Sequence, residues 1–265
     1  MTDTDREMLR ATFGQDAELY DRWRPGYPPQ LFADLATLAA LGPHARVLEI
    51  GCGTGQATLP LARRGCTVVA MDLSPDMAAV ARRNLAQFPD VTVVASAFEE
   101  WQPSDEPFDA VLSATAFHWL DPGVRMIKAA DLLRPGGALA IVSTHHIAGG
   151  TNAFFADAQR CYERFDPRTP PGLRLTTDDE TPEEAAEFDR SARFGPVEVR
   201  RYEWQQTYTA HEYLNLLMTY SGPRAMASPA RSDLFACLTD LIENVYTGEI
   251  SKQYRTRLAI AHKAP

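Results

Sequence analysis

The sequence predicts an α/β protein with a doubly wound, mostly parallel, seven-stranded sheet and an α-helical cap formed by insertions. From Arg46 to Thr144, short runs rich in β-branched residues alternate with longer segments whose apolar residues recur at helical spacing, which is typical of a parallel sheet with crossover helices. The first run leads directly into a glycine-rich turn. Two later strand patterns, Val197–Thr209 and Thr256–His262, would complete the sheet as an antiparallel pair.

Five short segments are predicted as the core strands: Arg46–Ile50, Thr67–Asp72, Val91–Ala95, Asp109–Ala114 and Ala138–Thr144. Three segments between them are predicted as helices: Ala57–Arg64, Pro75–Gln87 and Pro122–Leu133. Ser74 before Pro75 is typical of a helix start, because the serine oxygen caps a backbone N–H and proline has none to satisfy.

The segment from His145 to about Pro196 differs in composition from the core. It carries prolines at positions 167, 170, 171 and 182 and the acidic run Asp178–Glu180, so it is interpreted as an insertion rather than as sheet. Later, His211–Tyr220 and Asp233–Tyr246 are predicted as helices. Both insertions would lie over the carboxyl ends of the strands as a cap.

Composition narrows the classes of partner and compartment. The chain has 265 residues, a formal net charge of -9 and no lysine or arginine run, so nucleic acid is not expected as a partner. The segment Met1–Arg10 is unlike a secretory signal, and no stretch approaches the roughly 18 apolar residues of a membrane span. We therefore expect a cytoplasmic protein with no membrane partner.

The cysteines and the adjacent histidines give no sign of a metal site. Four cysteines at positions 52, 66, 161 and 237 lie far apart without a CxxC pair, which argues against structural zinc and a disulfide framework, and reduced thiols are expected. His145 and His146 would point to opposite faces of a strand and make a poor chelate. They are more simply two polar residues at a strand end.

The segment Val47–Gln56 indicates a nucleoside-like ligand. Its glycines let the backbone pass close to a ligand, and the following helix offers N–H groups. Asp72, at the end of the second strand, can accept hydrogen bonds from both hydroxyls of a ribose. The dinucleotide fingerprint would need glycine where Gln56 stands, and no Lys-Ser or Lys-Thr of a phosphate-binding loop follows.

The pattern Glu49-x-Gly51-x-Gly53-x-Gly55, followed by Asp72, resembles the class I S-adenosylmethionine-dependent methyltransferases, particularly the type 11 group. Asp72–Met77, Phe108–Val111 and Leu133–Gly137 also fit, and the resemblance covers about residues 10–144. It implies a Rossmann-like fold with S-adenosyl-L-methionine as cofactor. We expect N-terminal lid helices over 1–45, the cofactor-binding core over 46–144, a cap insertion over 145–196, and C-terminal strands over 197–265 with a second helical insertion at about 210–250.

The resemblance implies roles for particular residues. The three glycines would lie beneath the methionine part of the cofactor, Asp72 at the ribose, and Leu73 and Met77 beside the adenine. Ser96 stands where the family commonly has Asp, so its hydroxyl or the backbone after it would meet the adenine amino group. The implied cofactor-binding residues are Glu49, Gly51, Cys52, Gly53, Thr54, Gly55, Gln56, Asp72, Leu73, Met77, Ser96, Ala97, Phe98, Ser113 and Ala114.

The N-terminal stretch Tyr20–Pro28 resembles the segment of the same group that folds over the cofactor. Tyr20, Arg24 and Tyr27 are therefore candidates to meet the cofactor carboxylate or the substrate. The alternative is a surface helix end with a proline-limited turn.

The exit of the fourth predicted strand, Ser113–Asp121, should face the reacting methyl group, because the carboxyl ends of parallel strands form the ligand crevice. Its His-Trp-x-Asp pattern resembles the trans-aconitate methyltransferase branch, which implies an active-site role for His118 and Trp119. His118 is the candidate catalytic base. Alternatively, His118 forms a hydrogen bond across the loop while Trp119 packs.

The favoured function is O-methylation of a small-molecule acceptor. The resemblance and four arginines that could reach a cap site, at positions 24, 125, 174 and 200, suggest a carboxylate. An N- or C-methyltransferase of specialised metabolism, which an aromatic cap pocket would favour, and a non-catalytic S-adenosylmethionine-binding regulatory protein remain as alternatives. The sequence indicates neither the acceptor nor the oligomeric state.

Overall fold

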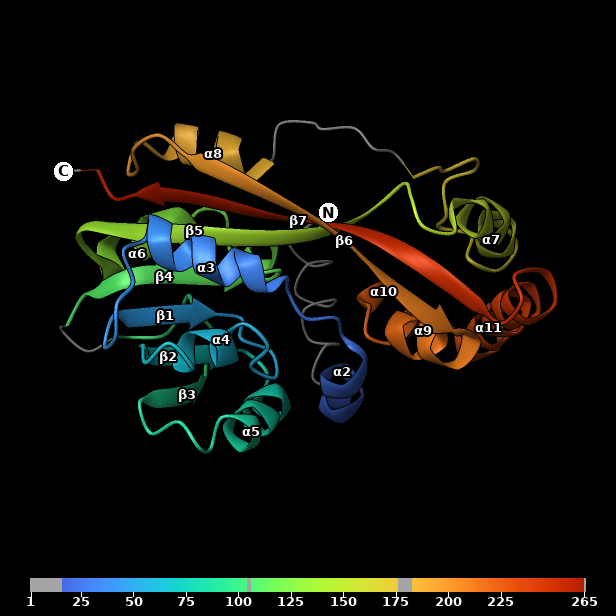
Figure 1. Ribbon diagram of the computed structural model, residues 1–265, viewed down its shortest axis with the longest axis horizontal. Coiled ribbons are helices and arrows are strands. Elements are labelled where there is room, and N and C mark those ends of the chain that lie inside the picture. The colour runs from blue at the N-terminus through green and yellow to red at the C-terminus, as the bar shows by residue number, and fades with distance from the viewer. Residues whose placement is uncertain (1–15, 104–105, 176–182, 265) are drawn as a thin grey trace.

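The computed structural model describes residues 16–103, 106–175 and 183–264, which build one seven-stranded sheet with the order β3-β2-β1-β4-β5-β7-β6 (Figure 1). The strands are β1 (Arg46–Ile50), β2 (Thr67–Asp72), β3 (Val91–Ala95), β4 (Phe108–Ala114), β5 (Leu133–Ile147), β6 (Glu198–Thr209) and β7 (Glu249–His262). β1 to β5 pair in parallel, whereas β7 is antiparallel to both β5 and β6. The predicted fold class and the antiparallel closing pair are confirmed.

Helices cover both faces of the sheet, because buried residues alternate between its two sides. Val47 of β1 packs with α3 (Pro29–Leu38), α4 (Thr58–Ala62) and α5 (Pro75–Asn84). Leu48 packs on the opposite face, with α6 (Arg125–Leu132) and α8 (Glu183–Ser191). The helix α5 begins as predicted, since the Ser74 hydroxyl accepts a hydrogen bond from the Met77 N–H and Pro75 follows it.

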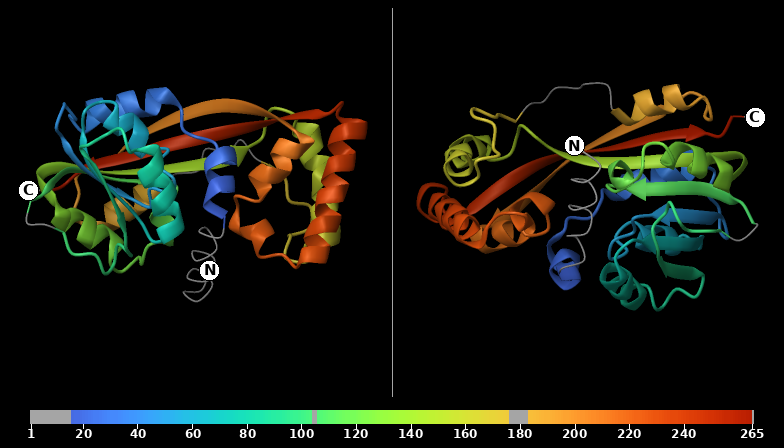
Figure 2. Two further views of the ribbon diagram at one scale, coloured as in Figure 1. Left: turned by 90° about the horizontal axis from the view of Figure 1, so that it is seen from below. Right: turned by 180° about the vertical axis from the view of Figure 1, so that it is seen from behind.

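The cap lies at the far end of the three long strands β5, β6 and β7, away from β1–β4 (Figures 1 and 2). It contains α7 (Asn152–Phe165), α9 (Ala210–Leu217), α10 (Ser221–Arg224), α11 (Ser228–Asp240) and the π-helical turn Leu241–Val245. Of these, α7, α9, α11 and the turn Leu241–Val245 share a hydrophobic core of their own, with Phe154, Leu216, Leu238 and Ile242 fully buried. The cap is thus a second packing unit built on extended sheet.

Part of the segment expected to be an insertion belongs to the main body of the protein. His145–Ile147 continue β5, because each pairs with β7, and β5 therefore ends three residues later than predicted. The helix α8 buries Phe188 against the core face that α6 covers, rather than in the cap. The acidic run Asp178–Glu180 and Pro182 lie outside the described residues.

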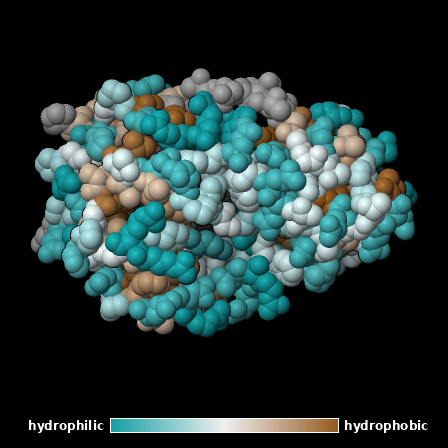
Figure 3. All heavy atoms as spheres, in the orientation of Figure 1, coloured by the Kyte–Doolittle hydropathy of each residue, from teal (hydrophilic) through white to brown (hydrophobic). Residues whose placement is uncertain are grey.

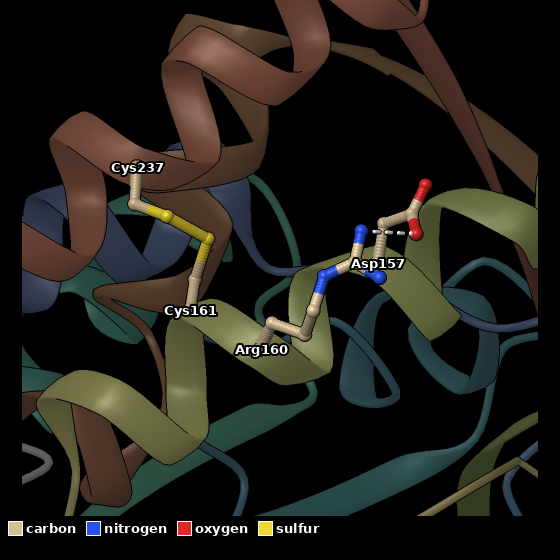
Figure 4. The surroundings of a disulfide bond; sticks show 4 residues. All are labelled: Asp157, Arg160, Cys161 and Cys237. Atoms are coloured by element: carbon tan, nitrogen blue, oxygen red, sulfur yellow. Dashed lines mark hydrogen bonds and ion pairs between the residues drawn. A yellow bond between two sulfur atoms is a disulfide. The ribbon is translucent and has the colours of Figure 1, made fainter.

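The prediction of reduced thiols is wrong for one pair of cysteines. Cys161 of α7 and Cys237 of α11 form a disulfide, with Cα atoms 6.0 Å apart (Figure 4). The two residues are 76 positions apart in the sequence, so only the packing of the two helices brings them together. On α7, Arg160 Nη2 lies 2.7 Å from Asp157 Oδ1 in the same view. Cys52 and Cys66 are free and buried.

On the face shown in Figure 3, hydrophilic residues predominate and the hydrophobic ones form small separate patches. Within residues 16–103, 106–175 and 183–264, no helix combines the length and apolar character needed to cross a membrane.

Candidate active site

A cavity of about 520 Å³ lies at the carboxyl edge of the parallel strands, and we call it the edge cavity. Its walls come from the turn after β1, the ends of β2 and β4, residues 143–145 of β5, the helix α2 (Ala17–Trp23), and the residues at the start of α10. Twelve of the predicted site residues line it: Tyr20, Arg24, Gly51, Gly53, Asp72, Leu73, Met77, Ser96, Phe98, Ala114, His118 and Trp119. This is the position at which open α/β sheets bind ligands.

The glycine turn leaves its backbone open to the cavity. Gly51 and Gly53 have φ values of +72° and +57°, a region that side-chain-bearing residues rarely adopt. A Cβ on Gly51 would also collide with the Cβ of Ala116, which lies on the loop after β4. Because glycine has no side chain, a ligand can approach the main chain more closely here than at any other type of residue.

The carboxylate of Asp72 is held in a fixed orientation by two backbone amides. The Gly53 N–H donates to Oδ2 and the Ser74 N–H to Oδ1, both at 2.9 Å. A carboxylate can accept about four hydrogen bonds, and the two amides use two of these positions. The Asp72 carboxylate, on the cavity wall, is therefore suited to accept hydrogen bonds from two further donors, such as the two hydroxyls of a ribose. Asp72 thereby connects the glycine turn with the start of α5.

One side of the edge cavity is apolar and fits a flat ring. Met77 and Phe98 are almost fully buried, whereas Leu73 is 39% exposed and lines the cavity next to Asp72. An apolar side chain left this exposed is covered when a ring packs against it. Ser96 also lines the cavity, and its hydroxyl donates to the Ala97 carbonyl at 3.2 Å.

Eight predicted site residues do not line the edge cavity: Tyr27, Glu49, Cys52, Thr54, Gly55, Gln56, Ala97 and Ser113. Glu49 is buried behind the turn and accepts a 2.6 Å hydrogen bond from the Thr58 hydroxyl. Burial raises the pKa of the Glu49 carboxyl to about 8. Thr54 Oγ1 and Gln56 Nε2, in the same turn, are buried and have no hydrogen-bond partner among the described residues.

Tyr20 of α2 and Arg24, the residue after the helix, line the edge cavity, which disagrees with the alternative of a surface helix end. The Arg24 guanidinium lies 4.5 Å from the ring centroid of Tyr220 and 5.6 Å from that of Tyr20. Its Nη1 also donates to the Thr219 hydroxyl at 3.4 Å. Tyr27 instead lies behind the wall, where its hydroxyl shares a 2.9 Å hydrogen bond with that of Thr115.

The loop after β4 presents an imidazole and an indole to the edge cavity, as predicted. His118 is exposed and Trp119 is half-buried, in the short 3-10 turn Phe117–Trp119. Their ring centroids are 4.7 Å apart. His118 therefore lies on the cavity wall, as the catalytic hypothesis requires, and its ring also packs against Trp119.

Several residues that line the edge cavity were not predicted: Ile50, Met71, Ser74, Thr115, Ala116, Leu120, Ser143, Thr144, His145, Tyr220 and Ser221. Ser143–His145 could have been found, because the predicted strand next to β4 ends at Thr144 and the same topological rule applies there. Tyr220 and Ser221 carried no signal, since they come from the second cap insertion.

The four arginines proposed for a cap site separate in the structure. Arg125 forms a bidentate pair with Glu187 at 2.7 and 2.8 Å, and Arg200 pairs with Glu198, away from the edge cavity. Arg24 lines the edge cavity, and Arg174 lines a second cavity in the cap. Of the residues described, no three histidine, cysteine or acidic side chains form a group that could hold a metal ion.

Comparisons with known proteins agree with this geometry. Residues 47–137 match a family model described as a methyltransferase domain. An uncharacterized methyltransferase of Mycobacterium tuberculosis strain H37Rv is 41% identical over 142 residues, which cover 54% of this chain and 55% of the relative. The trans-aconitate 2-methyltransferase of Deinococcus radiodurans is 33% identical over 109 residues, with 41% of each chain covered. The chain thus spans about half the length of these curated relatives.

A solved structure shares the fold. The phosphoethanolamine N-methyltransferase 2 of Haemonchus contortus, in complex with phosphomonomethylethanolamine and S-adenosylhomocysteine, superposes with a TM-score of 0.57 at 18% identity. The match covers 100% of this chain and 61% of the other.

Proposed function

We propose that this chain, a member of the class I S-adenosylmethionine-dependent methyltransferases, transfers a methyl group from S-adenosylmethionine to a small-molecule acceptor. One observation carries the proposal: the open glycine turn, the oriented carboxylate of Asp72 and the apolar side chain of Leu73 lie together on one cavity. This combination matches the amino-acid tail, ribose and adenine of one cofactor.

Each part of the cavity has a role in holding the cofactor. Gly51 and Gly53 would lie beneath its methionine part, Asp72 would accept the ribose hydroxyls, and Leu73 and Met77 would flank the adenine. The Arg24 guanidinium is the cation on this cavity that can meet a carboxylate of the cofactor or the acceptor.

The chemistry asked of the protein is mainly alignment. When bound, S-adenosylmethionine supplies a methyl group on a sulfonium that is already activated for transfer. The protein has to hold the acceptor in line and exclude water, and such alignment can lower a barrier by about 7–11 kcal/mol. Tyr20 of α2, Arg24 after it and Tyr220 from the cap line the same cavity as the strand ends.

The role of His118 depends on the acceptor. A hydroxyl or amine must lose a proton, and an imidazole nitrogen of His118 would take it up. A carboxylate is already ionised, and His118 would then only position it. O-methylation of a carboxylate is supported by the relative that acts on trans-aconitate, whose oxygens are all in carboxylates, and by the cationic Arg24 at the cavity.

An N- or C-methyltransferase is the second candidate function. It is favoured by the aromatic lining of the second cavity, to which Phe155, Tyr162 and Tyr213 contribute.

The composition of the sequence supports two further proposals, that the protein is cytoplasmic and that it has no nucleic-acid partner. The disulfide between Cys161 and Cys237 is a feature more common in oxidising compartments.

Titration calorimetry tests the proposal. S-adenosylmethionine and S-adenosylhomocysteine should bind and NAD should not, and a labelled methyl donor should pass its label to at least one member of a panel of small carboxylic acids, phenols and amines. Binding of NAD at equal or higher affinity would contradict the cofactor assignment. Binding without any methyl transfer to the panel would favour the regulatory alternative.

A further inference from the structure

A cavity of about 730 Å³ lies within the cap, and we call it the cap cavity. It is bordered by α7 and the segment after it, by the ends of α9 and the start of α10, and by β7. Its volume lies within the range of about 300–1,000 Å³ that small-molecule sites occupy. Much of its wall is aromatic, with rings from Phe155, Tyr162, Tyr213 and Tyr220.

Lys252 of β7 places an ammonium group in this aromatic wall. The residue is only 5% exposed, and its Nζ lies 3.5 Å from the Tyr220 hydroxyl and about 5 Å from the ring centroids of Tyr220 (5.2 Å) and Tyr254 (5.1 Å). No acidic side chain among the described residues forms an ion pair with it. A buried ammonium is costly unless an anion compensates it, so this group has the environment of a recognition site.

His146 is a second polar group on the same wall. Its Nε2 is buried and has no hydrogen-bond partner among the described residues, and its ring packs 4.3 Å from that of Phe155. Burial, together with the charge of Lys252, lowers the pKa of the imidazole to about 3. A neutral imidazole can donate one hydrogen bond to a ligand or accept one from it, and it does not compete with the charge of Lys252 for an anion.

The remaining charges on the wall also favour an anion. Arg168 is paired with Asp166 at 2.9 Å, whereas Arg174 is exposed at the rim and helps to lower the pKa of the nearby Glu163 carboxyl. The cap cavity therefore has an excess of positive charge even though the whole chain has a formal net charge of -9. Such local complementarity selects an anionic ligand.

Tyr220 connects the two cavities. It lines both, with the Arg24 guanidinium against its ring and Lys252 Nζ near its hydroxyl. The Tyr220 side chain is thus a wall that the two cavities share.

We propose that the cap cavity holds the body of the acceptor, a largely apolar, ring- or chain-bearing small molecule with a carboxylate that Lys252 binds. The inference rests on the proposed methyltransferase function and names the class of its acceptor. The aromatic walls would cover the apolar body, Lys252 would compensate the carboxylate, and the group that accepts the methyl would reach past Tyr220 into the edge cavity.

Matched pairs of acid and amide test the charge preference directly. Calorimetry on the wild-type protein with saturating S-adenosylhomocysteine would compare 1-naphthoate with 1-naphthamide, cinnamate with cinnamamide, and decanoate with decanamide. At least one acid should bind about tenfold or more tightly than its amide, the scale of a charge-assisted hydrogen bond. If no acid of the panel binds more tightly than its amide, the proposal is overturned.

A pair of lysine variants locates the site. Lys252→Met should remove the preference for the acid and leave the affinity for S-adenosylhomocysteine unchanged. Lys263→Met is the matched control, because Lys263 Nζ donates to the Leu133 carbonyl and lines neither cavity, so it should keep the preference. Circular dichroism checks that both variants fold, and should Lys252→Met not fold, Lys252→Gln replaces it and should likewise lose the preference.

The outcomes separate the two proposals. A preference for the acid that survives in Lys252→Met contradicts the acceptor site while leaving the proposed function intact. Failure of S-adenosylmethionine and S-adenosylhomocysteine to bind the wild type, seen in a titration without any acid, contradicts the proposed function itself and with it the acceptor role.

Discussion

At the scale of single residues, the edge cavity is organised by groups that the backbone holds in place. The Asp72 carboxylate accepts hydrogen bonds from two main-chain amides, and Glu49, behind the turn, accepts one from the Thr58 hydroxyl. These two acids differ in burial, since Asp72 lines the cavity and Glu49 is 1% exposed. One is therefore suited to meet a ligand, and the other to support the turn.

Replacing Asp72 should weaken cofactor binding. Asp72→Ala should reduce the affinity for S-adenosylhomocysteine by about 1–3 kcal/mol, the scale for losing hydrogen bonds to a charged group. Calorimetry measures this, with Asp76→Ala as control because Asp76 is exposed in the first turn of α5 and does not line the cavity. Unchanged affinity in a folded Asp72→Ala protein would remove Asp72 from the site.

The variant His118→Ala separates the two kinds of acceptor. For a hydroxyl or amine acceptor, kcat should fall by about 10²–10⁴-fold and the wild-type rate should rise with pH through one ionisation. For a carboxylate acceptor the loss should be smaller and appear mainly in KM. The pH–rate profiles of wild type and variant decide, with His262→Ala as control, since His262 lines neither cavity. A variant with full activity and an unchanged profile would make His118 a packing residue.

The buried carboxyl of Glu49 should make stability depend on pH. Its folded pKa is about 8 against an ordinary value of 4.5, so between these values the folded state binds more protons than the unfolded state. The free energy of unfolding should therefore decrease as pH rises from 4.5 to about 8, by on the order of a few kcal/mol. Denaturant unfolding of wild type and Glu49→Gln should show this decrease only in the wild type. Parallel pH dependences of the two proteins would contradict it.

At the scale of elements, the cap depends on long strands and on a covalent link. β5 and β7 run for 15 and 14 residues, which carries their hydrogen-bonded pairing from the core into the cap. The disulfide then ties α7, which follows β5, to α11, which precedes β7. Two elements from different insertions are held together in this way.

Removing the disulfide should destabilise the cap. Closing a loop of this length, with a sequence separation of 76, stabilises a protein by up to about 4 kcal/mol in the chain-entropy description. The double variant Cys161→Ser/Cys237→Ser should unfold at a lower Tm than the oxidised wild type. Adding a reductant should lower the Tm of the wild type and leave that of the variant unchanged. Equal Tm values for oxidised wild type and variant would show that the link contributes nothing.

At the scale of the whole molecule, the edge cavity forms where three parts of the chain meet. The core supplies the strand ends, the N-terminal segment of α2 and its C-cap supplies Tyr20 and Arg24, and the second insertion supplies Tyr220. A ligand in this cavity would contact all three parts and should restrict their motion relative to one another.

Hydrogen exchange tests this coupling. Binding of S-adenosylhomocysteine should slow amide exchange at residues 20–24 and 219–224 as well as at the glycine turn 51–55, because all three segments contribute to the walls. Amides of α6, which does not line the cavity, serve as the internal control. Protection confined to residues 51–55 would show that α2 and the cap do not close on the ligand.

Much of the core could be predicted because its signals are local. β1, β2 and β3 begin and end as expected, since β-branched runs bounded by turn residues define them. The sequence also predicted that Gly51, Gly53 and Asp72 meet one ligand, because parallel strands end at one edge of a sheet, and all three line the edge cavity. The cap was foreseen only as insertions with helices in the second of them.

By itself, the sequence determined that the sheet is mostly parallel, because this follows from the periodicity of its segments. It also determined the residues of the glycine turn, because these follow from the conformations open to glycine over a few neighbouring positions. Only the tertiary structure decided the rest. It joined Cys161 to Cys237, placed Tyr220 on the edge cavity and put the ammonium of Lys252 among aromatic rings. Each of these contacts joins segments far apart in the chain, and such pairings depend on how whole elements pack, which no local pattern of residues records.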